Sequence, residues 1–147
     1  MANIKNIVSL LAFLLCALPS NASLLEEGHY QVTSLIITQD NADRPRGFNN
    51  TGLYITVTGN RVRVAGAWRG FPIRRDAIIE RTIRDTLVLR DAENSSNVFK
   101  FHIRNNVVTN RHFVTHENGT QQVIDSRATL RKLSREEVDR LRTILNF

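Results

Sequence analysis

The sequence contains one cysteine, Cys16, and it falls in a segment that we expect to be removed. The remaining chain then has no cysteine, which excludes a disulfide framework, a thiol nucleophile and a cysteine-ligated metal. A domain without such cross-links has to be stabilised by its hydrophobic core alone. For an exported protein, this favours a bacterial periplasmic or secreted domain over a typical animal secretory one.

A long hydrophobic run is also missing. The longest apolar stretch, Ile7 to Leu18, falls short of the about 20 residues that span a bilayer, so we expect no membrane span. Lys5 precedes this stretch, and Pro19-Ser20-Asn21-Ala22 follows it and ends in a small residue. These are the parts of a secretory signal peptide. We therefore expect residues 1–22 to be a cleavable signal and residues 23–147 to form a single domain.

Lysine is scarce. Only Lys5, Lys100 and Lys132 occur, so 17 of the 20 basic residues are arginines, and the formal net charge is +6. Arginine suits planar, two-pronged contacts with carboxylates or phosphates, so an anionic partner is one interpretation of this bias. Codon usage combined with solubility is the other. The arginines are scattered and form no basic run of the kind found in nucleic-acid-binding arms, so we expect no nucleic-acid partner.

Motifs of catalysis and metal binding are absent as well. The sequence has no nucleophile motif, no glycine-rich phosphate loop and no paired-histidine metal motif. Asp40-Asn41-Ala42-Asp43 lacks the spacing, the glycine and the distal glutamate of a calcium loop. We therefore expect no cofactor and no metal, and a binding protein rather than an enzyme.

What the chain does contain is a series of short β-rich runs separated by turn residues, a pattern typical of an all-β sandwich or barrel. The pairs Gly59-Asn60, Asn105-Asn106 and Asn118-Gly119 favour tight hairpin turns. We expect eight strands in meander order, although the isoleucines of 73–83 also fit a helical turn. The expected strands are 29–38, 53–58, 61–67, 77–83, 86–90, 98–103, 107–116 and 121–133.

A helix is expected at the end of the chain, over residues 135–146. Ser134 stands three residues before Glu137, which is the spacing of a capping box. An apolar stripe at helical spacing follows, formed by Val138, Leu141, Ile144 and Leu145. We predict that this stripe packs on a barrel wall, against Leu35 and Ile37.

Eight up-and-down strands followed by a helix predict a small closed barrel. The first strand opens with Gly28-His29-Tyr30, which resembles the Gly-x-Trp signature of the lipocalin-like (calycin) group, with tyrosine in place of tryptophan. The resemblance in strand pattern covers the whole mature chain, whereas the resemblance in sequence motif covers only a few residues. It implies that the Tyr30 ring stacks against a basic side chain of the last strand, either Arg127 or Arg131.

A meander places alternate connections at the same end of a barrel. The tight turns at 59–60, 84–85 and 105–106 then close one end, and the longer loops 39–51, 68–76 and 91–97 gather at the other. Binding residues concentrate in such loops. We predict a binding mouth there, formed by Arg44, Arg46, Phe48, Trp68, Arg69 and Phe71, with Arg74 and Arg75 beside it. The alternative is that Trp68 and Phe71 cap the core and that the arginines are merely solvated.

The last three strands predict a second candidate site. If Asn118 and Gly119 are the two central turn residues, His112 pairs with Asp125 and Asn110 pairs with Arg127. These four side chains then share the inward face with Phe99 and Phe101 and could orient a ligand in a cavity. The alternatives are a satisfied structural network and a β-bulge that turns the later residues outward.

Together these features predict an exported, non-enzymatic protein: an all-β, eight-stranded up-and-down antiparallel β-barrel with a C-terminal α-helix. We expect it to bind a small amphipathic or anionic ligand, or an acidic protein surface, through its open-end loops. A periplasmic or secreted inhibitor, such as a toxin-immunity protein, would use the same loops without a cavity. A secreted hydrolase built on His112 and Asp125 is a third hypothesis. A filled barrel favours the inhibitor, and an empty one favours the ligand carrier.

Overall fold

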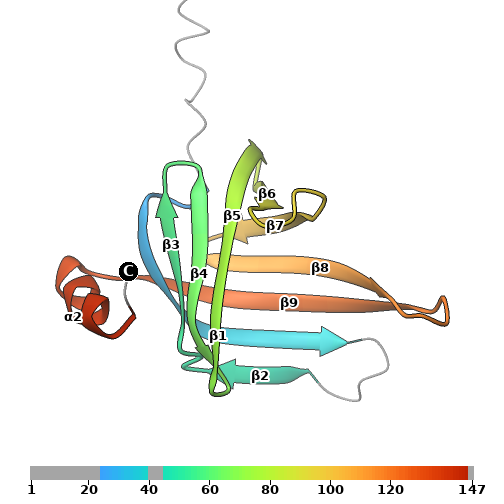
Figure 1. The fold of residues 1–147 in the computed structure, drawn as a ribbon, viewed down its shortest axis with the longest axis horizontal. Helices are drawn as coiled ribbons and strands as arrows, with labels where there is room; N and C mark the ends of the chain where they lie inside the picture. The colour runs from blue at the N-terminus through green and yellow to red at the C-terminus, as the bar shows by residue number, and fades with distance from the viewer. Residues whose placement is uncertain (1–23, 40–44, 146–147) are drawn as a thin grey trace, which may run out of the picture.

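The structure is a computed structural model that describes residues 24–39 and 45–145, without the side chains of 143–145. The predicted signal peptide and Arg44 lie outside these ranges. Within them the chain forms nine strands and one helix (Figure 1). The elements are β1 Gly28–Gln39, β2 Arg46–Asn49, β3 Leu53–Thr58, β4 Arg61–Trp68, β5 Phe71–Ile83, β6 Thr86–Asp91, β7 Val98–Arg104, β8 Val107–Thr115, β9 Gln121–Lys132 and α2 Arg135–Leu145.

Eight of the strands close into an antiparallel barrel in meander order. The sheet runs from β1 through β3 and then in sequence order to β9, which pairs back with β1. These eight strands correspond to the eight that the sequence predicts, and the barrel that the lipocalin-like resemblance implies is confirmed. Residues 73–83 belong to strand β5 and not to a helical turn. The short strand β2 lies within the connection 39–51, which the sequence pattern predicts as a loop.

β2 and β3 are two parts of one bent strand, and they pair with successive halves of β1. The corner lies between them, where the Thr51 hydroxyl donates a hydrogen bond of 2.8 Å to the Val32 carbonyl. Beside this corner β1 has a bulge, between Val32 and Ser34 in its pairing with β9. Bends and bulges of this kind let strands turn a barrel corner. In Figure 1, β3, β4 and β5 accordingly run across β8 and β9.

The hydrophobic core fills the barrel end that holds the tight turns at 59–60, 84–85 and 105–106. Leu25, in the segment before β1, is only 4% exposed and belongs to this core. The segment just before β1 therefore contributes to the core that closes this end of the barrel. The core consists of Leu25, Tyr30, Val32, Val57, Val62, Leu87, Leu89, Ile103 and Leu130.

Tyr30 has a different basic neighbour from the one that the resemblance implies. Lys132 lies opposite Tyr30 in the pairing of β1 with β9, whereas Arg131 lies opposite Gln31 and Arg127 lies opposite Ile36. The predicted stacking on Arg127 or Arg131 is therefore wrong. Lys132 also forms an ion pair of 2.7 Å with Glu26, whose carbonyl accepts a hydrogen bond from the Tyr30 hydroxyl.

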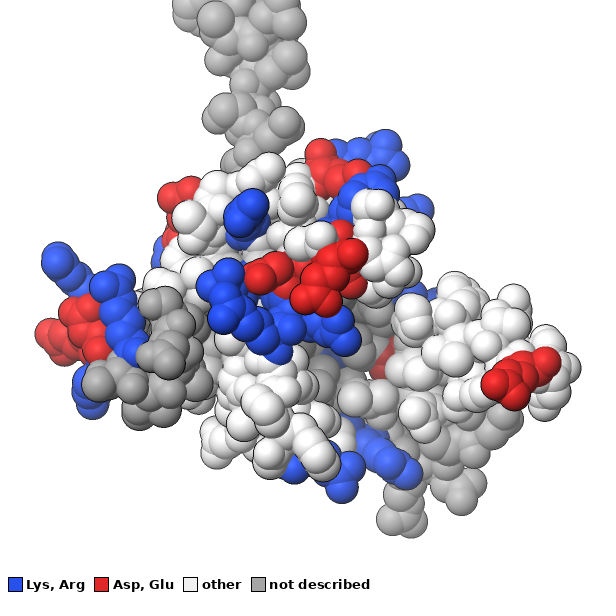
Figure 2. All heavy atoms as spheres, in the orientation of Figure 1, with Lys and Arg blue, Asp and Glu red and all other residues white. Residues whose placement is uncertain are grey.

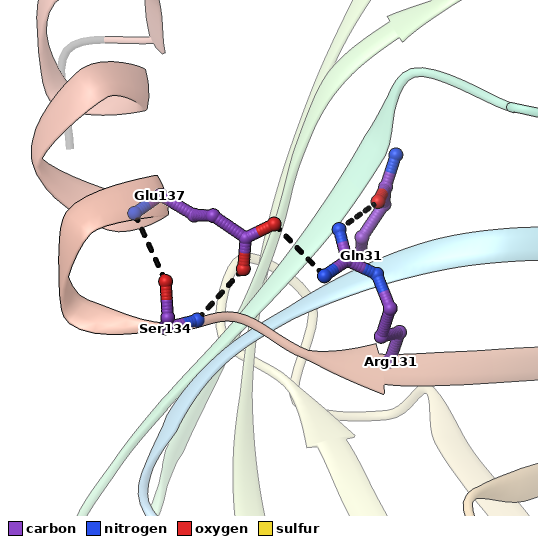
Figure 3. A network of polar contacts seen from close by, with 4 residues as sticks. All are labelled: Gln31, Arg131, Ser134 and Glu137. Atoms are coloured by element: carbon purple, nitrogen blue, oxygen red, sulfur yellow. Dashed lines mark hydrogen bonds and ion pairs between the residues drawn. The ribbon is translucent and has the colours of Figure 1, made fainter.

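Helix α2 begins with the predicted capping box (Figure 3). The backbone N–H of Ser134 donates to the Glu137 carboxylate at 2.8 Å, and the Glu137 N–H donates to the Ser134 hydroxyl at 3.3 Å. The same carboxylate accepts a bond of 2.8 Å from Arg131, which also donates to the side chain of Gln31. Strand β9, helix α2 and strand β1 are thereby joined at one point.

The prediction that the helix packs on Leu35 and Ile37 is wrong. The bulge at Thr33 shifts the alternation of β1, so that Leu35 packs against the barrel core, and Ile37 lies on the same face. The helix instead lies beside strands β1 and β3. Its Leu141 lines a shallow cleft together with Gln31 of β1 and Tyr54 of β3. Val138, in the first turn, is buried.

Candidate functional site

The barrel interior is not filled throughout. A pocket of about 380 Å³ lies between β4, β5, β6 and β7, beyond the core. This volume lies in the range of small-molecule sites. Its wall is mostly apolar and includes Val62, Val64, Ala77, Leu89, Phe99 and Phe101. Arg75, Asp76, Asp91 and Asn97 line its rim next to the connection between β6 and β7.

Strand β7, which forms one side of the pocket, pairs with β8 over only part of its length. The two strands pair only close to their turn, over His102 to Arg104 and Val107 to Thr109. Farther along, the side-chain amide of Asn110 donates a hydrogen bond of 2.8 Å to the carbonyl of Lys100. The Asn110 side chain therefore provides a hydrogen-bond donor for the Lys100 carbonyl of β7, which lies beyond the paired part of β7 and β8. Phe99 and Phe101, with ring centroids 6.3 Å apart, are half-buried and line the pocket.

The rim of the pocket has one cation with only a weak partner. Arg75 approaches Glu93 at 3.5 Å, but both side chains are about 70% exposed (69% and 73%), so water screens the pair. The two rim carboxylates have stronger partners. Arg63 donates to Asp76 at 2.6 Å and holds the pKa of that carboxyl below its ordinary value. Asp91 accepts backbone N–H groups of its own loop.

The sequence places Phe99 and Phe101 on the inward face and Arg75 beside the predicted mouth, but it also predicts a loop at 68–76. That prediction is wrong: Trp68 pairs directly with Phe71, and Arg69 and Gly70 form a tight two-residue turn. Both turn residues have positive φ, 50° and 85°, as such a turn requires. With the turn located, the pairing of Val64 with Arg75 places Arg75 on the inward face of the strand. The Arg69-Gly70 pair was the sequence signal that could have located this turn.

The predicted mouth residues are partly brought together. The rings of Phe48 in β2 and Trp68 in β4 meet edge to face, with centroids 4.7 Å apart. Phe71 lies opposite Trp68 and is 74% exposed. Arg46 and Arg69 are exposed at the same end of the barrel. None of these residues lines the pocket; they form a separate surface near it.

The predicted quartet of Asn110, His112, Asp125 and Arg127 is divided between two faces, so the prediction that the four side chains share the inward face is wrong. Asp125 pairs with Arg111 and Arg127 with Thr109 on one face, whereas Asn110 and His112 lie opposite Ser126 and Ile124 on the other. The hairpin loop has three residues, 117–119, instead of two. Gly119 ends it with a φ of 80°, and this shifts the pairing by one residue and reverses the faces.

The division separates His112 from Asp125 and removes the pair on which a hydrolase would depend. Asp125 accepts two hydrogen bonds from Arg111, at 2.8 and 3.1 Å, and these hold its pKa below the ordinary value. Asp125 and Arg127 line a groove on the outer side of β8 and β9, and Asn110 also borders it, so three of the four quartet residues lie along this groove. None of the four quartet residues lines the interior pocket.

No family model matches the sequence, and no curated protein matches it. Among solved structures, a chain described as "Odorant Binding Protein OBP1" is similar, with 12% identity and a TM-score of 0.38 over 80% of each chain. A likeness at this level supports no conclusion about ligand or function. The assignment of the barrel rests on its strand pairing.

Two further observations concern metal and membrane. Over residues 24–39 and 45–145, no group of three or more His, Cys, Asp or Glu side chains is placed to hold a metal ion. In the same part of the chain, no helix is both long and apolar enough to cross a bilayer.

Proposed function

We propose that the protein is an exported barrel that binds a small amphipathic anion in the pocket between β4 and β7. The observation that carries this proposal is the combination of an apolar pocket of about 380 Å³ with Arg75 at its rim. The wall would hold the apolar body of the ligand, and burial of that body supplies most of the affinity. The guanidinium would hold the anionic group and set the orientation of the ligand.

An open interior favours a ligand carrier over a protein inhibitor, because an inhibitor acts through its surface and needs no cavity. Export is part of the same proposal and is supported by the signal-like pattern of residues 1–22. The activity is binding and not catalysis, since the described carboxylates next to the pocket are held in ion pairs or loop hydrogen bonds. The site of action would be the periplasm or the medium.

The experiment measures binding of dodecanoate and of its neutral analogue dodecanol, by displacement of an anilinonaphthalene sulfonate dye. Arg75→Gln should weaken dodecanoate about tenfold and leave dodecanol unchanged, because one charge-assisted contact is lost. Arg74→Gln is the matched control: it removes the same charge from the adjacent residue, which faces away from the pocket and pairs with Ala65.

A second variant tests the cavity itself. Val64→Phe should fill the pocket and abolish binding of both ligands while the barrel stays folded, which circular dichroism would check. Binding that survives Val64→Phe, or wild-type protein that takes up neither dye nor ligand, would contradict the proposal. An equal loss in Arg74→Gln and Arg75→Gln would show a general charge effect and would also contradict the role of Arg75.

A further inference from the structure

We propose that the barrel docks on an anionic lipid bilayer through the tip of the β4–β5 hairpin and the adjacent strand β2. We call this region the tip surface. It consists of Arg46, Phe48, Trp68, Arg69 and Phe71. Three observations carry the proposal: an exposed aromatic cluster, a local excess of cationic charge without paired carboxylates, and the narrow shape of a two-residue hairpin tip.

The aromatic cluster is the first observation. Phe71 is 74% exposed, more than any other large hydrophobic side chain in the described part of the chain. It lies opposite Trp68, which contacts Phe48 edge to face. Aromatic side chains of this kind are enriched where a protein meets the headgroup region of a bilayer. Shallow insertion would take Phe71 out of water, which the fold itself does not do.

The charge pattern is the second observation. Residues 45–75 contain no Asp and no Glu, whereas the rest of the domain mixes both signs. Arg46 and Arg69 are exposed, and the described residues place no carboxylate within ion-pair distance of either; Asp40 and Asp43, which precede β2, lie outside the described residues. On the barrel walls some arginines are paired with a carboxylate, as Arg63, Arg90 and Arg111 are, and the walls also carry the acidic residues that the tip surface lacks. In Figure 2, blue atoms are visible at the lower edge, where Figure 1 places β2 and the β4–β5 turn.

The shape of the tip favours a bilayer over a protein partner. A stable protein interface buries about 800 Å² on each side, and this needs a broad, complementary surface. The β4–β5 hairpin ends in the two-residue turn Arg69-Gly70 and is therefore convex and narrow. Lipid headgroups can close around such a tip. Arginine then gains from the negative surface potential while the aromatic rings gain from burial.

The β4–β5 turn and the β6–β7 connection both lie opposite the tight turns of the meander, but residues 71–76 of β5 extend beyond the last residue that pairs with β6, Ala77. Docking would hold the pocket rim above the headgroups, separated from them by this part of β5, and an amphipathic ligand could be exchanged from there. This exchange rests on the proposed function. Docking itself does not, because the tip surface and the pocket wall share no residue.

The test is co-sedimentation of the mature protein with phosphatidylcholine vesicles that contain or lack phosphatidylglycerol. Trp68 is the single tryptophan of the chain, so its emission reports on the tip surface directly. We expect binding to phosphatidylglycerol vesicles with a blue shift of Trp68, and a decrease of both at high salt. Phe71→Ser and Arg69→Asn should each lower binding about fivefold. Asparagine tolerates the positive φ of residue 69.

The opposite end of the barrel provides matched controls. The β5–β6 turn also places an exposed apolar residue, Ile83 at 50%, beside an arginine with positive φ, Arg84. Ile83→Ser and Arg84→Asn should leave vesicle binding unchanged. The docking proposal is overturned if wild-type protein does not bind the anionic vesicles, if it binds both vesicle types equally, or if the controls lose as much binding as the tip variants.

The two proposals can fail separately. Val64→Phe should lose dodecanoate and still bind vesicles, whereas Phe71→Ser should lose vesicles and still bind dodecanoate in their absence. Loss of vesicle binding in Val64→Phe would mean that the interior pocket takes up lipid and that the tip does not dock, which would overturn the docking proposal. Unfolding midpoints of all variants check that each one is folded.

Discussion

Gly66 of β4 lies directly against Gly52, so that a Cβ atom on Gly66 would overlap the carbonyl oxygen of Gly52. The same oxygen accepts a hydrogen bond of 3.2 Å from the N–H of Ala67. The contact lies at the corner between β2 and β3, where the strand turns from one part of β1 to the other. Only a residue without a side chain fits here, and its φ of 137° also suits glycine alone.

Gly66→Ala should therefore destabilise the barrel by about 3 kcal/mol, because either the corner or β4 has to move. Urea unfolding followed by circular dichroism would measure the loss. Gly47→Ala is the control, since a Cβ at Gly47 meets nothing within 4 Å and its φ is not positive. Equal stability of the two variants would show that the corner is looser than its contacts indicate.

Trp68→Ala should lower the free energy of unfolding by about 1–3 kcal/mol, because the ring is half-buried and packs on Phe48. Phe71→Ala should change it by less than about 0.5 kcal/mol, since that ring is exposed. Thermal or urea midpoints of both variants would separate them. A large loss in Phe71→Ala would mean that this ring packs in solution, which would leave the tip surface without its anchor.

Val138→Ala should destabilise the protein by about 1–2 kcal/mol if helix α2 is docked, because Val138 is only 7% exposed. Asp139→Ala, at the next and exposed position, should change stability far less. The comparison needs only the two unfolding midpoints. Identical midpoints would indicate that the helix leaves the barrel in solution.

The ion pair of Arg63 with Asp76 should make stability depend on acid pH. The hydrogen bond from Arg63 holds the folded-state pKa of Asp76 below its ordinary value. The pair therefore stabilises the fold above the pKa of an unfolded aspartate, about 3.9, and this contribution is lost as the pH falls from there through the folded-state pKa. Both side chains are more than a third exposed, so the effect should stay below about 1 kcal/mol. Asp76→Asn and Arg63→Gln should flatten the curve equally.

Intact-mass measurement of the exported protein should find an N-terminus near Ser23. The motivation is the charged start, the apolar run and the small residue at Ala22. Cleavage there would leave Leu25 in the mature chain, where it belongs to the hydrophobic core. An exported protein that retains Met1 would contradict the prediction.

The local pattern of the sequence was enough for the eight barrel strands and most of the turns, but not for β2 or for the first residues of β5. Gly59-Asn60 and Asn105-Asn106 form the expected two-residue turns, and the pairing of Val57 with Val62 follows from the first of them. The capping box of Ser134 and Glu137 is equally local. Such features depend on backbone preferences and on neighbours a few residues away, which is why the residues themselves determine them.

What the tertiary structure decided is which face each side chain takes. One additional residue in the loop 117–119 separated Asp125 from His112, and one bulge in β1 turned Leu35 into the core. A strand alternates with a period of two, so a shift of a single residue reverses every later side chain. The energy that selects the register comes from contacts across the closed barrel. The Arg69-Gly70 turn is local and sets the face that Arg75 takes, but the pocket itself was decided by closure, which brings β4 to β7 around one space.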